Sequence, residues 1–128
     1  MPAANADIVR ANSAAFSRRD VEAMLLFFAP DAIVRDRRTV GWGEFHGRDA
    51  IRAYYEGLFD NADEIYEDLA VVSEEGDVVV ASCHVSAHLA GQGQADVVTF
   101  DYALKVTLAD GLITALEIYE DAAAAGAG

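Results

Sequence analysis

The stretch "FFAPDAIVRD", residues 27–36, contains the change of secondary structure on which the fold prediction depends. Pro30 cannot continue a helix, because it lacks a backbone donor and disfavours a helical residue before it. A strand is therefore predicted to follow it. In a strand, Ala32, Val34 and Asp36 share one face, so the alternation turns an acidic side chain toward the apolar side.

Helical patterns precede and follow this strand. Residues 7–20 place one polar side chain, Asn12, on the same helical face as Ile8, Ala15 and Phe16. A second helix over 21–29, with Asp20 as its N-cap, must stop at Pro30. After "HGRD" comes the clearest helix, whose apolar side chains recur at i, i+3, i+4, i+7 and i+8: Ile51, Tyr54, Tyr55, Leu58 and Phe59.

The second half of the chain reads as strands. Beyond Asn61 the apolar period falls to two, which predicts strands over 65–72, 77–89, 96–109 and 112–120. The element order α-α-β-α-β-β-β-β predicts an α+β fold, with helices on one face of a curved, mainly antiparallel sheet. Residues 1–128 are expected to form a single domain, frayed over 1–5 and 122–128.

Composition excludes several functions. The net charge of −13, from 22 acidic residues against nine basic ones, repels a phosphate backbone and disfavours nucleic-acid binding. No apolar run is long enough for a membrane span, and the start lacks the regions of a signal peptide, so a cytoplasmic protein is expected. The single cysteine, Cys83, allows no internal disulfide, and we expect its side chain to be buried in the packing of the core. No glycine-rich phosphate loop or metal cluster appears, so we expect no cofactor.

Several motifs resemble the NTF2-like superfamily, especially its SnoaL-like and ketosteroid-isomerase-like domains. They are a helix ending "FFAP", the strand "DAIVRD" and the helix start "FHGRDAIRAYY", and the likeness covers roughly residues 7–121. The resemblance implies a cone-shaped barrel with a deep apolar pocket between sheet and long helix, and usually a homodimer. It implies the activity less well, because this fold hosts isomerases, cyclases, hydrolases, dehydratases and association domains.

Some of the catalytic residues of ketosteroid isomerases have a counterpart at the matching position of this chain. By this resemblance Asp36 stands where the general base stands, and Asn12 replaces the tyrosine that binds the oxyanion. Tyr55 matches a supporting tyrosine on the long helix. Leu104 replaces the second catalytic acid, which argues against true steroid isomerisation.

The resemblance also implies a pocket lining. It turns His84 inward as an acid–base group, for which a solvated or interface histidine is the alternative. Trp42 and His46 lie in a glycine-flanked loop that borders the pocket mouth in this fold. The expected lining is Phe16, Phe28, Trp42, Tyr54, Leu58, Phe59, Tyr102, Leu104, Leu116, Ile118 and Glu120.

Each main candidate also has a purely structural interpretation. Asp36 is either a desolvated carboxylate whose pKa rises toward the range of a general base, or a strand-end acid paired with Arg35, Arg37 or Arg38. Asn12 either binds a ligand carbonyl or satisfies nearby backbone. The tyrosines of the long helix serve recognition or packing.

Three functions follow. The favoured one is a SnoaL-like pocket protein, acting as a cofactor-free isomerase, cyclase or lyase on a small apolar carbonyl compound, with Asp36 as general base. The same pocket could instead bind a hydrophobic ligand without turnover, using Asp36 as an anchor. The third function is a dimerising association domain.

Overall fold

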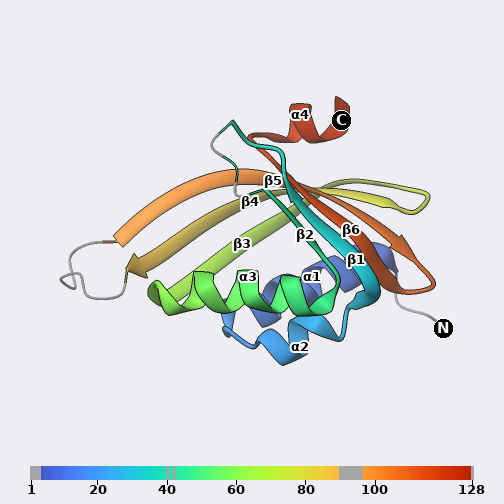
Figure 1. Ribbon diagram of the computed structural model, residues 1–128. Coiled ribbons are helices and arrows are strands. Elements are labelled where there is room, and N and C mark those ends of the chain that lie inside the picture. The colour runs from blue at the N-terminus through green and yellow to red at the C-terminus, as the bar shows by residue number, and fades with distance from the viewer. Residues whose placement is uncertain (1–3, 40, 42, 90–96, 128) are drawn as a thin grey trace.

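The computed structural model describes residues 4–39, 41, 43–89 and 97–127. Three helices, α1 (Asn5–Ser17), α2 (Val21–Leu25) and α3 (Arg48–Asp60), lie under the concave side of a curved sheet (Figure 1). A short helix, α4 (Ala122–Ala127), lies on the other side of that sheet. The predicted α+β fold, with its three helices on one face, is confirmed.

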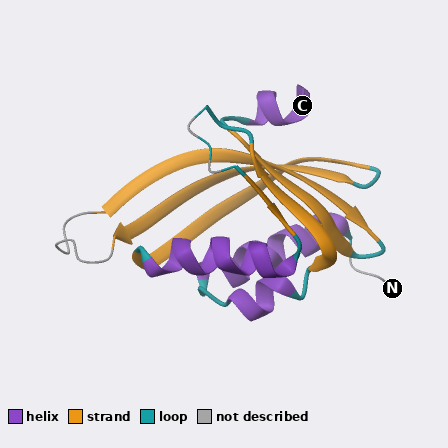
Figure 2. Cartoon of the chain, in the orientation of Figure 1, coloured by secondary structure: helices purple, strands orange, loops and turns teal. Residues whose placement is uncertain are grey.

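The sheet has six strands in the order β2-β1-β6-β5-β4-β3. Figure 2 shows these strands as one curved layer with helices on its inner side. β1 and β6 pair in parallel, and the other four neighbouring pairs are antiparallel. The sheet curves without closing, so the cone is open on one side. The strands are β1 (Phe28–Asp36), β2 (Glu44–His46), β3 (Ala62–Glu75), β4 (Val78–Leu89), β5 (Val97–Ala109) and β6 (Leu112–Tyr119).

The junction at Pro30 differs from the prediction in one respect. Asp20 caps α2 as expected, since its Oδ1 accepts from the Ala23 N–H at 3.1 Å. However, α2 ends at Leu25 and β1 already begins at Phe28, so Pro30 lies inside the strand. The register between β1 and β6 is irregular over this part of β1, so the missing N–H of Pro30 interrupts no regular ladder.

The core fills the space between the helices and the concave face of the sheet. α3 contributes Ile51, Tyr55 and Phe59, which are all buried. β4 contributes alternate residues, among them Cys83, which is buried as predicted and whose thiol pKa is raised by that burial. The helical spacing of apolar residues therefore predicted the buried face of α3 correctly.

Two short elements were not predicted. β2 has three residues and pairs with β1 through Ile33 and His46, which is too short for alternation to be visible in the sequence. α4 forms from a tail that was expected to make no core contacts. Ala125 in α4 is fully buried against Val80 and Ala103 on the convex face of the sheet.

Candidate functional site

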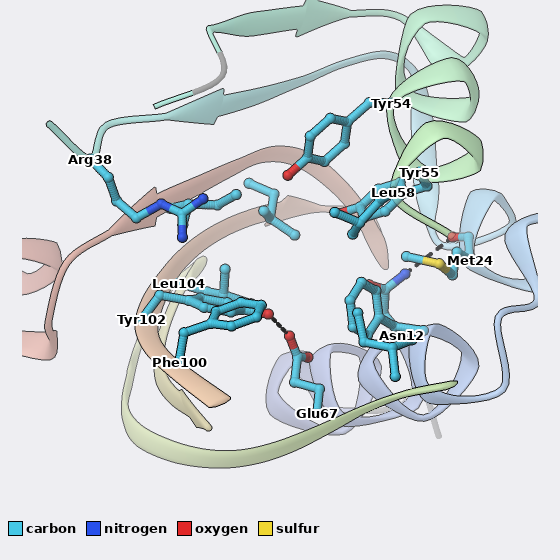
Figure 3. A pocket seen from close by; sticks show the side chains of 14 residues that line it. Asn12, Met24, Arg38, Tyr54, Tyr55, Leu58, Glu67, Phe100, Tyr102 and Leu104 are labelled. Carbon is cyan, nitrogen blue, oxygen red and sulfur yellow. Dashed lines mark hydrogen bonds between the residues drawn. The ribbon is translucent and has the colours of Figure 1, made fainter. Parts of the chain in front are cut away.

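A cavity of about 170 Å³ lies between the concave face of the sheet and helices α1 and α3 (Figure 3). Its walls are mainly apolar and aromatic, with a few polar groups among them. Such a composition is typical of small-molecule sites. The lining residues are Asn12, Phe16, Met24, Arg38, Tyr54, Tyr55, Leu58, Ile65, Glu67, Phe100, Tyr102, Leu104, Leu116 and Ile118.

One polar corner of the cavity is formed by Arg38, which pairs with the buried Asp36 behind it. The Asp36 side chain is only 1% exposed, which confirms that the alternation of β1 turns it away from solvent. Its Oδ1 accepts from Arg38 Nε at 2.9 Å, and its Oδ2 accepts from Arg38 Nη2 at 2.7 Å. The Arg38 backbone N–H also donates to Oδ1. This two-point ion pair fixes the guanidinium plane and occupies both carboxylate oxygens.

The loop after β1 makes this pairing possible. Gly41 packs so closely that a Cβ atom there would lie 2.7 Å from the Asp36 carbonyl oxygen and 2.8 Å from that of Arg38. The Gly41 N–H donates to the Arg38 carbonyl. This tight turn brings the Arg38 side chain against the carboxylate of Asp36, two residues earlier.

Arg38 faces the cavity and Asp36 lies behind it. The guanidinium carbon is 5.7 Å from the centre of the Tyr102 ring, which is within the range of a cation–π contact. The Asp36 carboxylate raises the pKa of Arg38, so the guanidinium stays charged. Because Nε and Nη2 are used by Asp36, Nη1 is the terminal nitrogen with no hydrogen-bond partner among the described residues. It is available to an oxygen atom in the cavity.

A second polar corner is built around Glu67. This residue is 8% exposed, and each of its carboxyl oxygens accepts from a hydroxyl group. Ser13 Oγ donates to Oε1 at 2.7 Å, and the Tyr102 hydroxyl donates to Oε2 (Figure 3). Burial raises the pKa of Glu67 and the two hydroxyl donors lower it, with burial the larger effect. No cation lies within ion-pair distance of it in the described part of the chain.

Glu67 was missed at the sequence level, although the signal was present. In β3, Ile65, Glu67, Leu69 and Val71 share one face, so the alternation that singled out Asp36 also turns Glu67 inward. α1 is placed to receive it. Ser13 binds its carboxyl, and the Ser17 hydroxyl accepts from the Glu67 backbone N–H at 2.9 Å.

The cavity also contains Asn12 and two tyrosines of α3. Asn12 Nδ2 donates to the Met24 carbonyl at 3.2 Å, so one amide hydrogen satisfies backbone, as in its structural interpretation. The hydroxyl pKa of Tyr54 is raised to about 12, mainly by burial. Burial also raises that of Tyr55 well above its usual value. Both phenols are therefore protonated near neutral pH.

Nine residues of the predicted site line the cavity: Asn12, Phe16, Tyr54, Tyr55, Leu58, Tyr102, Leu104, Leu116 and Ile118. Phe28 and Phe59 do not; they are core residues, and Phe59 packs against Phe16 with ring centres 5.3 Å apart. Trp42 lies outside the described residues. Arg38, Met24, Ile65 and Phe100 line the cavity and were not predicted to do so.

Two predicted positions are corrected by the structure. His84 is on the convex face of the sheet, not inward, and its Nδ1 lies 2.6 Å from Asp101 Oδ1 in an exposed pair. Its neighbours in β4, Cys83 and Val85, are buried on the opposite, concave face of the sheet. Glu120 follows β6 and is exposed, and its Oε1 accepts from the Thr39 hydroxyl at 2.9 Å. His46 is exposed and lies 3.1 Å from Glu44 Oε2.

Other features bear on the class of protein. Among the described residues, no three side chains of His, Cys, Asp or Glu are gathered so that they could hold a metal ion. Within the same ranges, the helices are too short or too polar for any of them to cross a membrane.

Comparison with known families agrees with this geometry. The family model of the SnoaL-like domain matches residues 9–116. The chain belongs to the SnoaL-like domain family. No curated protein sequence matches it significantly.

Solved structures share the same fold. An NTF2-like protein of unknown function from Burkholderia pseudomallei has a TM-score of 0.77 and 22% identity, covering 94% of this chain and 92% of its own. A protein from Sinorhizobium meliloti, provisionally named a polyketide cyclase, has a TM-score of 0.71 and 27% identity over 88% of this chain and 93% of its own. TerC, co-crystallised with polyporic acid, has a TM-score of 0.75 and 22% identity over 94% and 93%. The predicted superfamily is thus confirmed.

Proposed function

We propose that the cavity binds a small, largely apolar carbonyl compound and promotes its isomerisation, cyclisation or elimination without a cofactor. The observation that carries this proposal is the Arg38 guanidinium, which Asp36 fixes at the edge of a mainly apolar and aromatic cavity. Each of these reactions passes through an enolate or a similar oxyanion. A fixed donor in a dry cavity stabilises such an oxygen more than water does.

In this proposal Asp36 positions Arg38 instead of acting as the general base. Both Asp36 oxygens are bound by Arg38, and the carboxylate is separated from the cavity by that side chain. A base in this position would have to break a two-point ion pair before accepting a proton. Held in place, the pair instead leaves Arg38 Nη1 for the ligand oxygen.

The size of the cavity limits the enclosed part of the ligand. An engineered apolar cavity of ~150 Å³ holds benzene, and this one measures about 170 Å³. One six-membered ring therefore fits inside, beside the rings of Tyr54, Tyr102 and Phe100. Larger compounds would extend through the mouth. Co-crystallisation of TerC with polyporic acid supports an acidic organic ligand in a protein of this fold.

Binding of 4-nitrophenol and nitrobenzene tests the proposal, since the phenolate oxygen resembles an enolate oxygen and nitrobenzene lacks it. At pH 8 we expect wild type to bind 4-nitrophenol more tightly. Arg38→Met should weaken this binding about tenfold or more, as expected for a lost charge-assisted hydrogen bond. Nitrobenzene affinity should change less than about twofold, since its burial in the apolar cavity is kept.

The matched control is Arg37→Met, because Arg37 is half exposed and pairs with Glu117 outside the cavity. It should leave both affinities unchanged. Because Arg38→Met removes the guanidinium that pairs with the buried Asp36 carboxylate, the double variant Asp36→Asn with Arg38→Met is measured beside it. Equal affinity of wild type for the two compounds, or no binding of either, would contradict the proposed function.

A further inference from the structure

We propose that Glu67 and Tyr102 form a proton relay that takes a proton from the compound in the cavity and returns it. The inference rests on the proposed function and identifies the acid–base group that it lacks. Both side chains line the cavity, and the Tyr102 hydroxyl donates to Glu67 Oε2. The phenol is thus the contact with the ligand and the carboxylate lies behind it.

The surroundings of Glu67 suit proton exchange better than those of Asp36. Asp36 is bound by a guanidinium, which fixes it in the ionised form. Glu67 is bound by two neutral hydroxyl groups, which can donate to a carboxylate and can also accept from a carboxylic acid. Burial disfavours its charge and raises its pKa above that of an ordinary glutamate, which favours a carboxyl group that accepts and returns a proton.

Four titratable groups close to Glu67 stay protonated when it ionises. Charged side chains line the cavity or the adjoining hollow together with Glu67: Arg38, Arg10, Arg18 and Asp68. Four further titratable groups surround it, namely Tyr102 from β5, Tyr54 and Tyr55 from α3, and Cys83 from β4. Burial raises the pKa of each of these four groups, so they stay protonated near neutral pH. Glu67 therefore ionises while these four groups keep their protons.

The position of Tyr102 relative to Arg38 fits the reaction. The guanidinium carbon is 5.7 Å from the Tyr102 ring centre and both residues line the cavity, so one small ligand can contact Arg38 and Tyr102 together. Phe100, whose ring centre is 6.1 Å from that of Tyr102, covers the same side of the cavity. In this arrangement the carbonyl oxygen of the ligand contacts Arg38, and its acidic carbon contacts Tyr102.

The step balances as a transfer of one proton. The carbon next to the carbonyl gives its proton to the Tyr102 oxygen, and the phenol proton passes to Glu67 Oε2 in the same event. The C–H electron pair becomes the enolate, whose negative oxygen lies beside Arg38. In the return step, Glu67 gives its proton back to Tyr102 and Tyr102 protonates the same or another carbon, which restores the carboxylate.

Deuterium exchange at the carbons beside the carbonyl of cyclohexanone, followed by NMR in D₂O, tests this step directly. We expect wild-type exchange to rise with pH to a plateau, as Glu67 ionises. Glu67→Gln should reduce the rate about 100-fold or more, the usual effect of losing a general base, and Tyr102→Phe should reduce it as well. Both should bind nitrobenzene within about twofold of wild type, because the apolar walls are kept.

Two controls separate a relay from a structural link between α1 and the sheet. Glu64→Gln changes an exposed glutamate on the same strand and should leave the exchange rate unchanged. Ser13→Ala removes one donor that lowers the Glu67 pKa. It should therefore move the midpoint of the exchange profile to higher pH while keeping the plateau. A structural link alone would not shift that midpoint.

The outcomes distinguish the relay from the function on which it rests. If wild type binds 4-nitrophenol through Arg38 and exchanges no deuterium, the relay is wrong and a ligand-binding cavity stands. If exchange survives Glu67→Gln and is lost in Asp36→Asn, Asp36 is the base and the relay is wrong. If neither 4-nitrophenol nor nitrobenzene binds, the proposed function fails first.

Discussion

The Asp36 corner and the Glu67 corner of the cavity each bury an acid, but they stabilise it in different ways. At the first, the carboxylate meets a guanidinium at two points, so its charge is matched and fixed. At the second, two hydroxyl groups meet a carboxyl that has no cation beside it in the described structure. The difference shows that burial alone does not define a base. The partner decides whether the proton can move.

The largest effect is expected when Asp36 loses its partner. Arg38→Met should reduce the free energy of unfolding by about 3 kcal/mol, because it removes the guanidinium that pairs at two points with a buried carboxylate. Urea denaturation at pH 7 measures it. Adding Asp36→Asn should recover most of the loss, since no charge remains buried. Arg37→Met, at a side chain 48% exposed, should cost less than about 0.5 kcal/mol. Equal losses of unfolding free energy in Arg38→Met and Arg37→Met would contradict a special role for the Asp36–Arg38 pair.

The same corner can be disturbed without touching its charges. Gly41→Ala places a Cβ atom within 3 Å of two backbone oxygens, so the loop must shift and the Asp36–Arg38 geometry with it. We expect a loss of about 2 kcal/mol, in the range of strained substitutions. Gly57→Ala in α3, where a Cβ would meet nothing within 4 Å, should instead raise stability by about 0.5 kcal/mol. The opposite signs can be measured in one set of urea titrations.

Removal of the Glu67 charge should act in the other direction and depend on pH. The pKa of Glu67 in the folded state is raised above 4.5. At low pH Glu67 is protonated in both the folded and the unfolded state, so it costs no stability. As the pH rises through the folded pKa, its ionisation lowers the free energy of unfolding. Glu67→Gln should therefore match wild type near pH 4. At pH 8 we expect a thermal midpoint about 3 °C higher, which corresponds to about 1 kcal/mol. Thermal unfolding at both pH values measures the difference, and a lower midpoint at pH 8 would show that ionised Glu67 stabilises the fold.

The smallest effect is expected on the convex face. His84 and Asp101 also form a close pair, but their side chains are 53% and 76% exposed. Water screens such a pair, so His84→Ala should change the free energy of unfolding by less than about 0.5 kcal/mol between pH 5 and 8. A larger loss would mean that this face is covered in solution.

The sequence predicted the fold well, because the helices and strands carry clear periodicity. Alternation in β1 turned Asp36 inward, and the helical spacing of α3 placed Tyr54 and Tyr55 at the cavity. The partner of Asp36 could not be decided among Arg35, Arg37 and Arg38, because the choice depends on how the chain turns after the strand. Gly41 makes that turn.

Two errors in the site have physical explanations. His84 was turned inward by family resemblance, although the alternation of Cys83 and Val85 in β4 gives it the opposite face. Glu67 was overlooked because a glutamate in a strand flanked by other acids looks solvated, yet its parity with Ile65 places it inside. Local alternation would have been the better guide at both positions. The homodimer and the apolar ligand stay predictions.

The parallel pairing of β1 with β6 has a consequence for how the chain acquires its site. Ile33 in β1 pairs with Ala115 in β6, so these neighbours in the sheet come from distant parts of the chain. Contacts between such distant segments form slowly, because a long loop must close first. During synthesis α1, with Asn12, emerges early, and the wall formed by Ile118 emerges last. A ribosome-bound chain that stops before β6 therefore has helices and hairpins but no enclosed cavity.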